Sequence, residues 1–145
     1  MSIWYNDQAP DIAALTKMGA ASMAGHLGIE FVGHGDDWLA ARMPVDHHTH
    51  QPFGRLHGGA SVALAETVAS VGGAMTVDPQ LSLVVGMEIN ANHIRPAKQG
   101  WVTATAKAES IGRTSQIWTI RIVDEANRLV CLSRITLAVI AAARG

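Results

Sequence analysis

The residues with the clearest chemical potential lie in one stretch, Gln51–Gly73, with the sequence QPFGRLHGGASVALAETVASVGG. Its second half consists almost entirely of small and aliphatic residues, and Glu66 is the single charge in that half. On a helix, the residues three and four positions from Glu66 are also small or aliphatic. A carboxylate in such surroundings favours a chemical role over that of a solvated surface charge. Ser70, one helical turn later, is placed to hydrogen-bond Glu66 or an adjacent water.

The chain just before this apolar run offers a counterpart to the carboxylate. Gly58 and Gly59 would form the first helical turn, where backbone N–H groups have no intrahelical partner. Without a Cβ in the way, these groups can stabilise an oxygen that gains negative charge during a reaction. His57 would occupy the cap position, either as a structural cap or as a catalytic group. Gln51 could orient a carbonyl or a water.

A second group of candidates is cationic. In the run NANHIRP, His93 and Arg95 are two residues apart, so a continuous strand would present them on the same face. This pair is either a solvated strand end or a contact for a phosphate, which the arginine side chain suits well. Arg55 and Arg113 are weaker candidates of the same kind.

The run HHTH, which contains His47, His48 and His50, is the pattern that suggests a metal site. No cysteine lies nearby, and the spacing does not match a pair of helical ligands four residues apart. We therefore expect no metal at these histidines.

The pattern of the whole chain predicts an α+β domain over residues 1–145 that holds these groups. Residues 60–71 contain no Gly or Pro and repeat apolar residues at helical spacing, so we expect a central helix over 58–75. An N-terminal helical segment (1–26) would precede it. A long apolar helix must be covered, which favours a curved antiparallel sheet wrapped around it. The other expected elements are a helix at 10–18 and strands at 29–35, 38–43, 82–95, 100–111, 116–123 and 129–140.

Composition narrows the function classes. The 145 residues are 48% hydrophobic and 16% charged, with a formal net charge of −1, which gives no long-range attraction to nucleic acid or to an anionic membrane. The low charge density suggests extra surface buried between subunits. The single cysteine, Cys131, excludes an internal disulfide framework. Since the first residues also lack a secretory pattern, we expect a cytoplasmic protein without a membrane segment.

The spacing of Gly58 and Glu66 predicts an assembly. These residues are eight positions apart, which corresponds to about 12 Å along one helix. A donor to a carbonyl oxygen and a group attacking the same carbonyl must lie within roughly 7 Å of each other. If both residues act on one carbonyl, Glu66 must therefore face Gly58 of a second chain. We predict a two-fold dimer as the minimal active unit, with two equivalent sites across its interface.

The run QPFGRLHGGASVALAET resembles the hotdog-fold acyl-CoA thioesterases, in which a curved antiparallel sheet wraps one long helix. The similarity is greatest to the branch of the 1,4-dihydroxy-2-naphthoyl-CoA hydrolases of menaquinone synthesis. The run also resembles the 4-hydroxybenzoyl-CoA thioesterases that carry their carboxylate on the helix. The resemblance extends over MAGHLGIEF, ARMPVD, VVGMEINANHIRP and the last predicted strand, and so covers most of the chain.

The resemblance implies roles for the candidate residues. Glu66 would act as nucleophile or general base on the thioester carbonyl, and the Gly58 N–H would polarise that carbonyl. Gln51 and His57 would position substrate, thiolate or water, while Ser70 would assist Glu66. The family is similar in using no metal and no bound cofactor, since coenzyme A is part of the substrate, and it forms tetramers of hotdog dimers.

The remaining site positions concern substrate binding. By the same resemblance, His93 and Arg95 match positions that contact the nucleotide of coenzyme A. The chain departs from its relatives at Ile94, where a second histidine is common, and at Val71, where a methionine is common. Both changes could alter the acyl or nucleotide pocket, so the identity of the acyl group does not transfer.

The function expected from these observations is hydrolysis of aromatic or medium-length acyl-CoA thioesters to the free acid and coenzyme A. Two alternatives remain. A hotdog hydratase or dehydratase would also pair a histidine with a carboxylate, and a catalytically silent module would bind coenzyme A without cleaving it.

Overall fold

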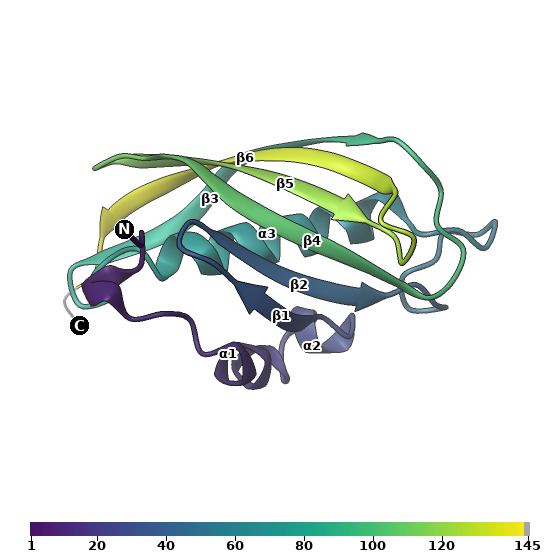
Figure 1. Ribbon diagram of the computed structural model, residues 1–145, viewed down its shortest axis with the longest axis horizontal. Coiled ribbons are helices and arrows are strands. Elements are labelled where there is room, and N and C mark those ends of the chain that lie inside the picture. The colour runs from purple at the N-terminus through teal and green to yellow at the C-terminus, as the bar shows by residue number, and fades with distance from the viewer. Residues whose placement is uncertain (144–145) are drawn as a thin grey trace.

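The computed structural model describes residues 1–143 and contains one antiparallel sheet of six strands, in the order β1-β2-β4-β5-β6-β3. The sheet curves around a single long helix, α3 (Gly58–Ala74), as Figure 1 shows. This arrangement confirms the predicted α+β architecture. The strands are β1 (Glu30–His34), β2 (Trp38–Pro44), β3 (Ser82–His93), β4 (Trp101–Ile111), β5 (Ser115–Val123) and β6 (Leu129–Ala141).

Small residues on one side of α3 let it approach the sheet closely. A Cβ on Gly72 would lie 3.0 Å from the Trp118 ring, and one on Gly73 would lie 2.6 Å from Leu137 Cδ1. The two glycines therefore serve close packing within the helix, which continues past them to Ala74. The face of α3 against the sheet is formed by Ser61, Leu64, Ala65, Val68, Ala69, Gly72 and Gly73, all buried.

The predicted alternation along β4 is confirmed, because Val102, Ala104 and Ala106 have no exposed surface and face α3. Their small side chains leave room for the helix beneath a curved sheet. Trp118 of β5 fills the centre of the core, and its indole N–H donates to Gln116 Oε1 at 2.9 Å. The core thus combines small residues near the helix with the large aromatic side chains of Trp118, Trp4 and Phe31.

The N-terminal segment forms a short 3-10 turn, η1 (Tyr5–Asp7), and two helices, α1 (Ile12–Gly19) and α2 (Met23–His26). Asp11 caps α1 by accepting a hydrogen bond from the Ala14 N–H at 3.1 Å. α1 overlaps the helix expected at 10–18, and α2 lies within the helical segment expected over 1–26. Both helices lie beside β1, at the edge of the sheet opposite β3 (Figure 1).

Strand β3 is an edge of the sheet and is unusually apolar on its exposed side. Leu83, Val85 and Met87 expose between 41% and 68% of their surface. An edge strand also presents unpaired backbone N–H and C=O groups. This edge therefore has the properties of a surface that another chain covers.

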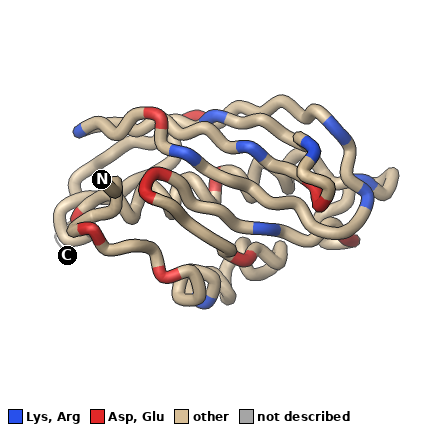
Figure 2. Tube along the Cα trace, viewed as in Figure 1, with Lys and Arg blue, Asp and Glu red and all other residues tan. Residues whose placement is uncertain are grey.

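Charges of both signs are spread over the strands and loops, as Figure 2 shows, without a belt of one sign. In the part of the chain that the structure describes, no helix is long and apolar enough to cross a membrane.

Candidate functional site

The first turn of α3 leaves one backbone donor free. His57 is the N-cap, and its Nδ1 accepts a hydrogen bond from the Gly59 N–H at 2.8 Å. The Ala60 N–H donates to the His57 carbonyl at 3.0 Å. Among residues 1–143, no acceptor receives the Gly58 N–H, because it precedes the first intrahelical bond. The Ser61 N–H also donates to the His57 carbonyl, at 3.2 Å. His57 therefore accepts hydrogen bonds from three amide groups and leaves the Gly58 N–H for another oxygen.

His93 lies directly beside Gly58. A Cβ built on Gly58 would come within 2.8 Å of His93 Nε2, so the absence of a side chain at position 58 makes room for the imidazole. The sequence placed His93 with the phosphate-binding candidates. In the fold, its ring is adjacent to the free N–H at the head of the helix, where it can also contact a reacting group.

Gln51 shapes the loop that leads into α3. Its Oε1 accepts hydrogen bonds from the Phe53 N–H at 2.6 Å and the Arg55 N–H at 3.3 Å. The Gln51 N–H in turn donates to the Arg55 carbonyl at 2.7 Å. Because the carbonyl side of the amide is committed to the loop, the Nε2 group is the part that can serve a ligand.

A polar cavity of about 330 Å³ collects these groups. Gln51, Gly58 and His93 line it together with Arg55 and Arg95. No acidic residue is among the described residues around it, so the cavity is cationic and suits an anionic ligand such as a phosphate. The structure thus brings four of the predicted site residues together and adds Arg55, a weaker candidate in the sequence.

One expected detail of this region is wrong: Arg95 does not lie on the same strand face as His93, because β3 ends at His93. Beyond it, the Ile94 and Arg95 N–H groups both donate to the Val130 carbonyl, at 2.8 and 3.2 Å, so the regular ladder stops. Pro96 then prevents its continuation. Arg95 nevertheless lines the polar cavity from this loop.

Arg113 is separated from these groups. It lies in the turn between β4 and β5, while the polar cavity is at the opposite end of the sheet, near the start of β4. The length of β4 corresponds to about 35 Å between these ends. Within one chain, Arg113 therefore does not join the cationic residues of the cavity.

Glu66 lies in a second cavity, of about 560 Å³, along the face of α3 that the sheet does not cover. Ser70 and Val71, two further candidates from the sequence, line the same cavity. Thr67 and Ser70 are the hydroxyl residues in the lining. The Thr67 Oγ1 donates to the Ala63 carbonyl at 2.6 Å. Glu66 is therefore a carboxylate within a largely apolar surface.

Gly86 of β3 provides space for this carboxylate. A Cβ built on Gly86 would lie 3.0 Å from Glu66 Oε1. The pairing of β3 with β6 also shifts register between Gly86 and Glu88, which bends the strand at this point. Sequence analysis did not single out Gly86, since only the packing of β3 against α3 brings it to Glu66.

The polar and apolar cavities have no lining residue in common. The first is at the N-terminal end of α3, and the second extends along its middle. Within one chain, the Gly58 N–H and the Glu66 carboxylate thus belong to different cavities. These are the two groups that the sequence analysis expected to act on one carbonyl.

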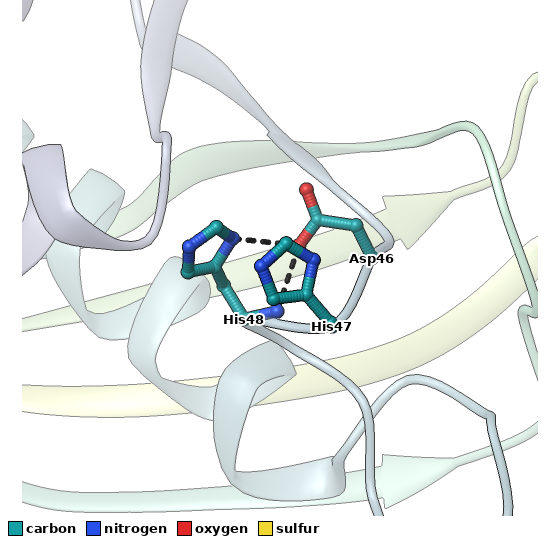
Figure 3. A group of neighbouring side chains, drawn as sticks. All are labelled: Asp46, His47 and His48. Carbon is teal, nitrogen blue, oxygen red and sulfur yellow. Dashed lines mark hydrogen bonds and ion pairs between the residues drawn. The ribbon is translucent and has the colours of Figure 1, made fainter.

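The loop before α3 brings Asp46, His47 and His48 together, with candidate ligand atoms within 4.8 Å of one another (Figure 3). Asp46 Oδ1 accepts hydrogen bonds from the His48 N–H at 2.9 Å and contacts His48 Nδ1 at 3.2 Å. The backbone hydrogen bond from His48 holds the pKa of the Asp46 carboxyl below its ordinary value. His50 lies apart, with Nε2 2.9 Å from the Lys98 carbonyl. A loop turn accounts for these contacts.

Known proteins with similar sequences are thioesterases and esterases. The chain is 50% identical over 129 residues to a 1,4-dihydroxy-2-naphthoyl-CoA hydrolase from Escherichia coli, which covers 89% of this chain and 94% of the relative. It is also 50% identical over 129 residues to a proofreading thioesterase from Cronobacter turicensis, covering 88% and 93% of the two chains.

Solved structures agree in fold. A thioesterase from Haemophilus influenzae superposes with a TM-score of 0.91 at 47% identity, covering 96% of this chain and 95% of that one. A protein from Staphylococcus aureus was solved as a glutamate-to-alanine variant, with a TM-score of 0.81, 37% identity and coverage of 83% and 100%. The same protein, described as a thioesterase, was also solved as a glutamine-to-alanine variant, with a TM-score of 0.79, 38% identity and coverage of 81% and 97%.

The profile of the Thioesterase superfamily matches residues 53–131, which include α3, β3, β4 and β5. The curved six-stranded sheet around one helix is the hotdog fold of that family. The resemblance identified in the sequence is thereby confirmed. By its fold, its matched residues and its relatives, the chain belongs to the thioesterase superfamily.

Proposed function

We propose that this thioesterase hydrolyses aromatic or medium-length acyl-CoA thioesters, with Glu66 attacking or activating water and the Gly58 N–H of a partner chain binding the carbonyl oxygen. The observation that carries the proposal is the division of α3. Its head has a free backbone donor beside a cationic cavity, and its middle has a carboxylate on an apolar surface. Thioester hydrolysis requires both an activated attack and stabilisation of an oxyanion.

The chemistry follows from these two groups. Glu66 either bonds to the carbonyl carbon, giving an anhydride that water then cleaves, or removes a proton from water as it attacks. In both routes the carbon–sulfur bond breaks, coenzyme A leaves as the thiol, and the acyl group leaves as the acid. The Gly58 N–H would stabilise negative charge on the carbonyl oxygen, which is worth about 10²–10³ in rate for one donor of this kind.

The relatives support the choice of residues. The glutamine and the glutamate replaced by alanine in the two Staphylococcus aureus structures are separated by the same number of residues as Gln51 and Glu66. Experimenters thus targeted a Gln–Glu pair with this spacing in a thioesterase of related sequence. This agreement supports Gln51 and Glu66 as parts of the site.

Coenzyme A would enter through the polar cavity. Arg55 and Arg95 line it and offer bidentate contacts to the phosphates of the nucleotide. His93 lies beside Gly58, and Gln51 lines the same cavity. Both would contact the thioester or the leaving thiolate. The acyl group would then lie against the apolar face of α3 around Glu66.

A dimer accounts for the separation of the two cavities. Because one helix places Gly58 and Glu66 about 12 Å apart, antiparallel approach of two α3 helices would set each Glu66 opposite the partner's Gly58. The exposed apolar edge of β3 supports such an assembly, since it would otherwise contact water. We propose this dimer as the active unit and a tetramer of two dimers as the complete assembly, in the cytoplasm.

The test is release of free thiol from benzoyl-, naphthoyl-, phenylacetyl- and fatty acyl-CoA esters by the unsubstituted protein and by Glu66→Gln. Cys131 has no exposed surface and burial raises its pKa, so it should add little background to a thiol reagent. We expect Glu66→Gln to lower kcat by at least about 10³ with the fold retained.

Glu109→Gln is the matched control, because Glu109 is exposed on β4 and lines neither cavity. Near-normal turnover by Glu66→Gln would refute the assignment. An enoyl thioester adds a further arm. Loss of its absorbance without thiol release would indicate a hydratase, and binding of every ester without change would indicate a silent module.

A further inference from the structure

A third cavity, of about 320 Å³, lies at the C-terminal end of α3, under the N-terminal segment. Val71, Ala74 and Met75 form one side of it, while Leu15 and Met18 of α1 form the other. No charged residue is among the described residues that line it. The sequence offered no sign of this cavity, because its two sides are more than fifty residues apart in the chain.

The third cavity adjoins the cavity that contains Glu66. Val71 lines both, and it lies five residues after Glu66 on the same uncovered face of α3. The distance along the helix is about 7.5 Å from Glu66 to Val71 and about 12 Å to Ala74. An acyl group whose carbonyl is at Glu66 and which extends toward the end of α3 would therefore enter the third cavity.

The N-terminal segment is fastened over this end of the helix. The Tyr5 N–H donates to the Met75 carbonyl at 2.9 Å, and the Tyr5 hydroxyl donates to Asp78 Oδ2 at 2.8 Å. Trp4 anchors the same segment, since its indole N–H donates to the Gly35 carbonyl at 2.8 Å. These contacts hold the far wall of the cavity in place without a covalent link.

Resting on the proposed thioesterase activity, we infer that the cavity between α1 and the end of α3 is the distal acyl-binding site, and that the N-terminal segment selects long over short acyl groups. Acetyl and butyryl groups end before Val71, whereas the last carbons of an extended octanoyl group reach beyond it. The uncharged lining favours alkyl and aryl groups without a terminal charge. The selecting wall lies outside residues 53–131, the part that matches the superfamily profile.

Ala74→Phe tests this inference, because Ala74 is exposed at the helix end and a phenyl ring there would fill the cavity. The measurement is the ratio of kcat/KM for octanoyl-CoA to that for butyryl-CoA. Each methylene kept out of an apolar site costs about fourfold, so excluding two or more should lower the ratio at least tenfold. Ala13→Phe, on the exposed side of α1 outside the cavity, should leave the ratio within twofold.

Met18→Glu provides a second, independent variant. Met18 is 69% exposed at the mouth of the cavity, so the change should not disturb folding. A carboxylate there should lower the same ratio about fivefold or more, through the cost of placing a charge beside an apolar group. An unchanged ratio in both variants would overturn the inference. Failure of the unsubstituted protein to release thiol from any ester would instead overturn the thioesterase proposal itself.

Discussion

The two ends of α3 differ in kind. At its N-terminal end, polar groups converge on a cationic cavity, and the helix contributes a backbone N–H without any side chain. From its middle onward, the uncovered face is apolar, and the helix contributes a single carboxylate. Under the proposed function, one end would receive an anionic carrier and a developing oxyanion, while the other would supply the attacking group and receive an apolar acyl chain.

This difference shows how one helix can serve a two-part reaction. Its two functional groups cannot meet within one chain, since about 12 Å of helix separates them. In the proposed dimer, two copies related by a two-fold axis would form two such sites, because the head of each helix would meet the middle of the other. The following substitutions test whether the two ends of α3 have these separate roles.

After the loss of the Glu66 carboxylate, the largest effect is expected from removing the backbone donor at the head. Gly58→Pro deletes the N–H, and proline is tolerated at the first position of a helix. The preceding residue, His57, has φ −67° and ψ 131°, which is compatible with a following proline. We expect kcat to fall by about 10²–10³, measured by thiol release.

Gly58→Ala is the control for that experiment. It keeps the N–H but adds the same Cβ, which would meet His93 Nε2 at 2.8 Å. If the two variants lose equal activity, crowding of His93 explains the loss and the N–H is not the oxyanion donor.

The second prediction concerns the meeting of head and middle across two chains. Co-expression of Gly58→Pro with Glu66→Gln in equal amounts should restore about a quarter of the unsubstituted activity, because half of the dimers would be mixed and each would hold one intact site. Each variant alone should stay near background. Activity of the mixture equal to the mean of the two separate variants would place the whole site within one chain.

A smaller effect is expected where β3 makes room for the carboxylate. Gly86→Ala would push Glu66 Oε1 aside by a few tenths of an ångström. Since small misplacements of an attacking group are costly, we expect kcat to fall roughly tenfold with KM little changed. Gly33→Ala in β1 is the matched control, because its Cβ would meet Trp38 at an ordinary 3.5 Å. A rise in KM alone would contradict a positioning role.

The smallest effect is expected from the cap. His57→Ala should lower the free energy of unfolding by about 1 kcal/mol, since the Gly59 N–H loses its acceptor. His57→Asn can restore that acceptor, so its urea midpoint should return close to that of the unsubstituted protein. If His57→Asn unfolds normally but loses turnover by more than tenfold, His57 acts on the substrate and not only as a cap.

The sequence was informative where periodicity and local chemistry decide the structure. The apolar run around Glu66 predicted α3 within one residue, and the alternation of β4 predicted its buried face. The spacing of Gly58 and Glu66 predicted that they cannot act on one carbonyl within one chain, and the two residues line separate cavities. These features depend on neighbours along the chain, so a single sequence contains them.

Features made by distant segments were not predictable in the same way. Gly86 approaches Glu66 only because β3 bends beside α3, and the distal cavity exists only because α1 folds back over the end of that helix. The departure of Arg95 from the strand arises from two amides that share the Val130 carbonyl. Each depends on a contact between residues whose order in the sequence does not reveal their proximity.

The apolar edge of β3 has a consequence for how activity depends on concentration. Under the proposed assembly, this edge and the uncovered face of α3 are buried only when two chains associate, so catalysis obeys mass action. Dilution would abolish turnover by dissociating the dimer while each chain kept its fold. A substrate that contacts both chains would shift the monomer–dimer equilibrium back toward the dimer. The edge strand β3 would then set the protein concentration above which the chain is active.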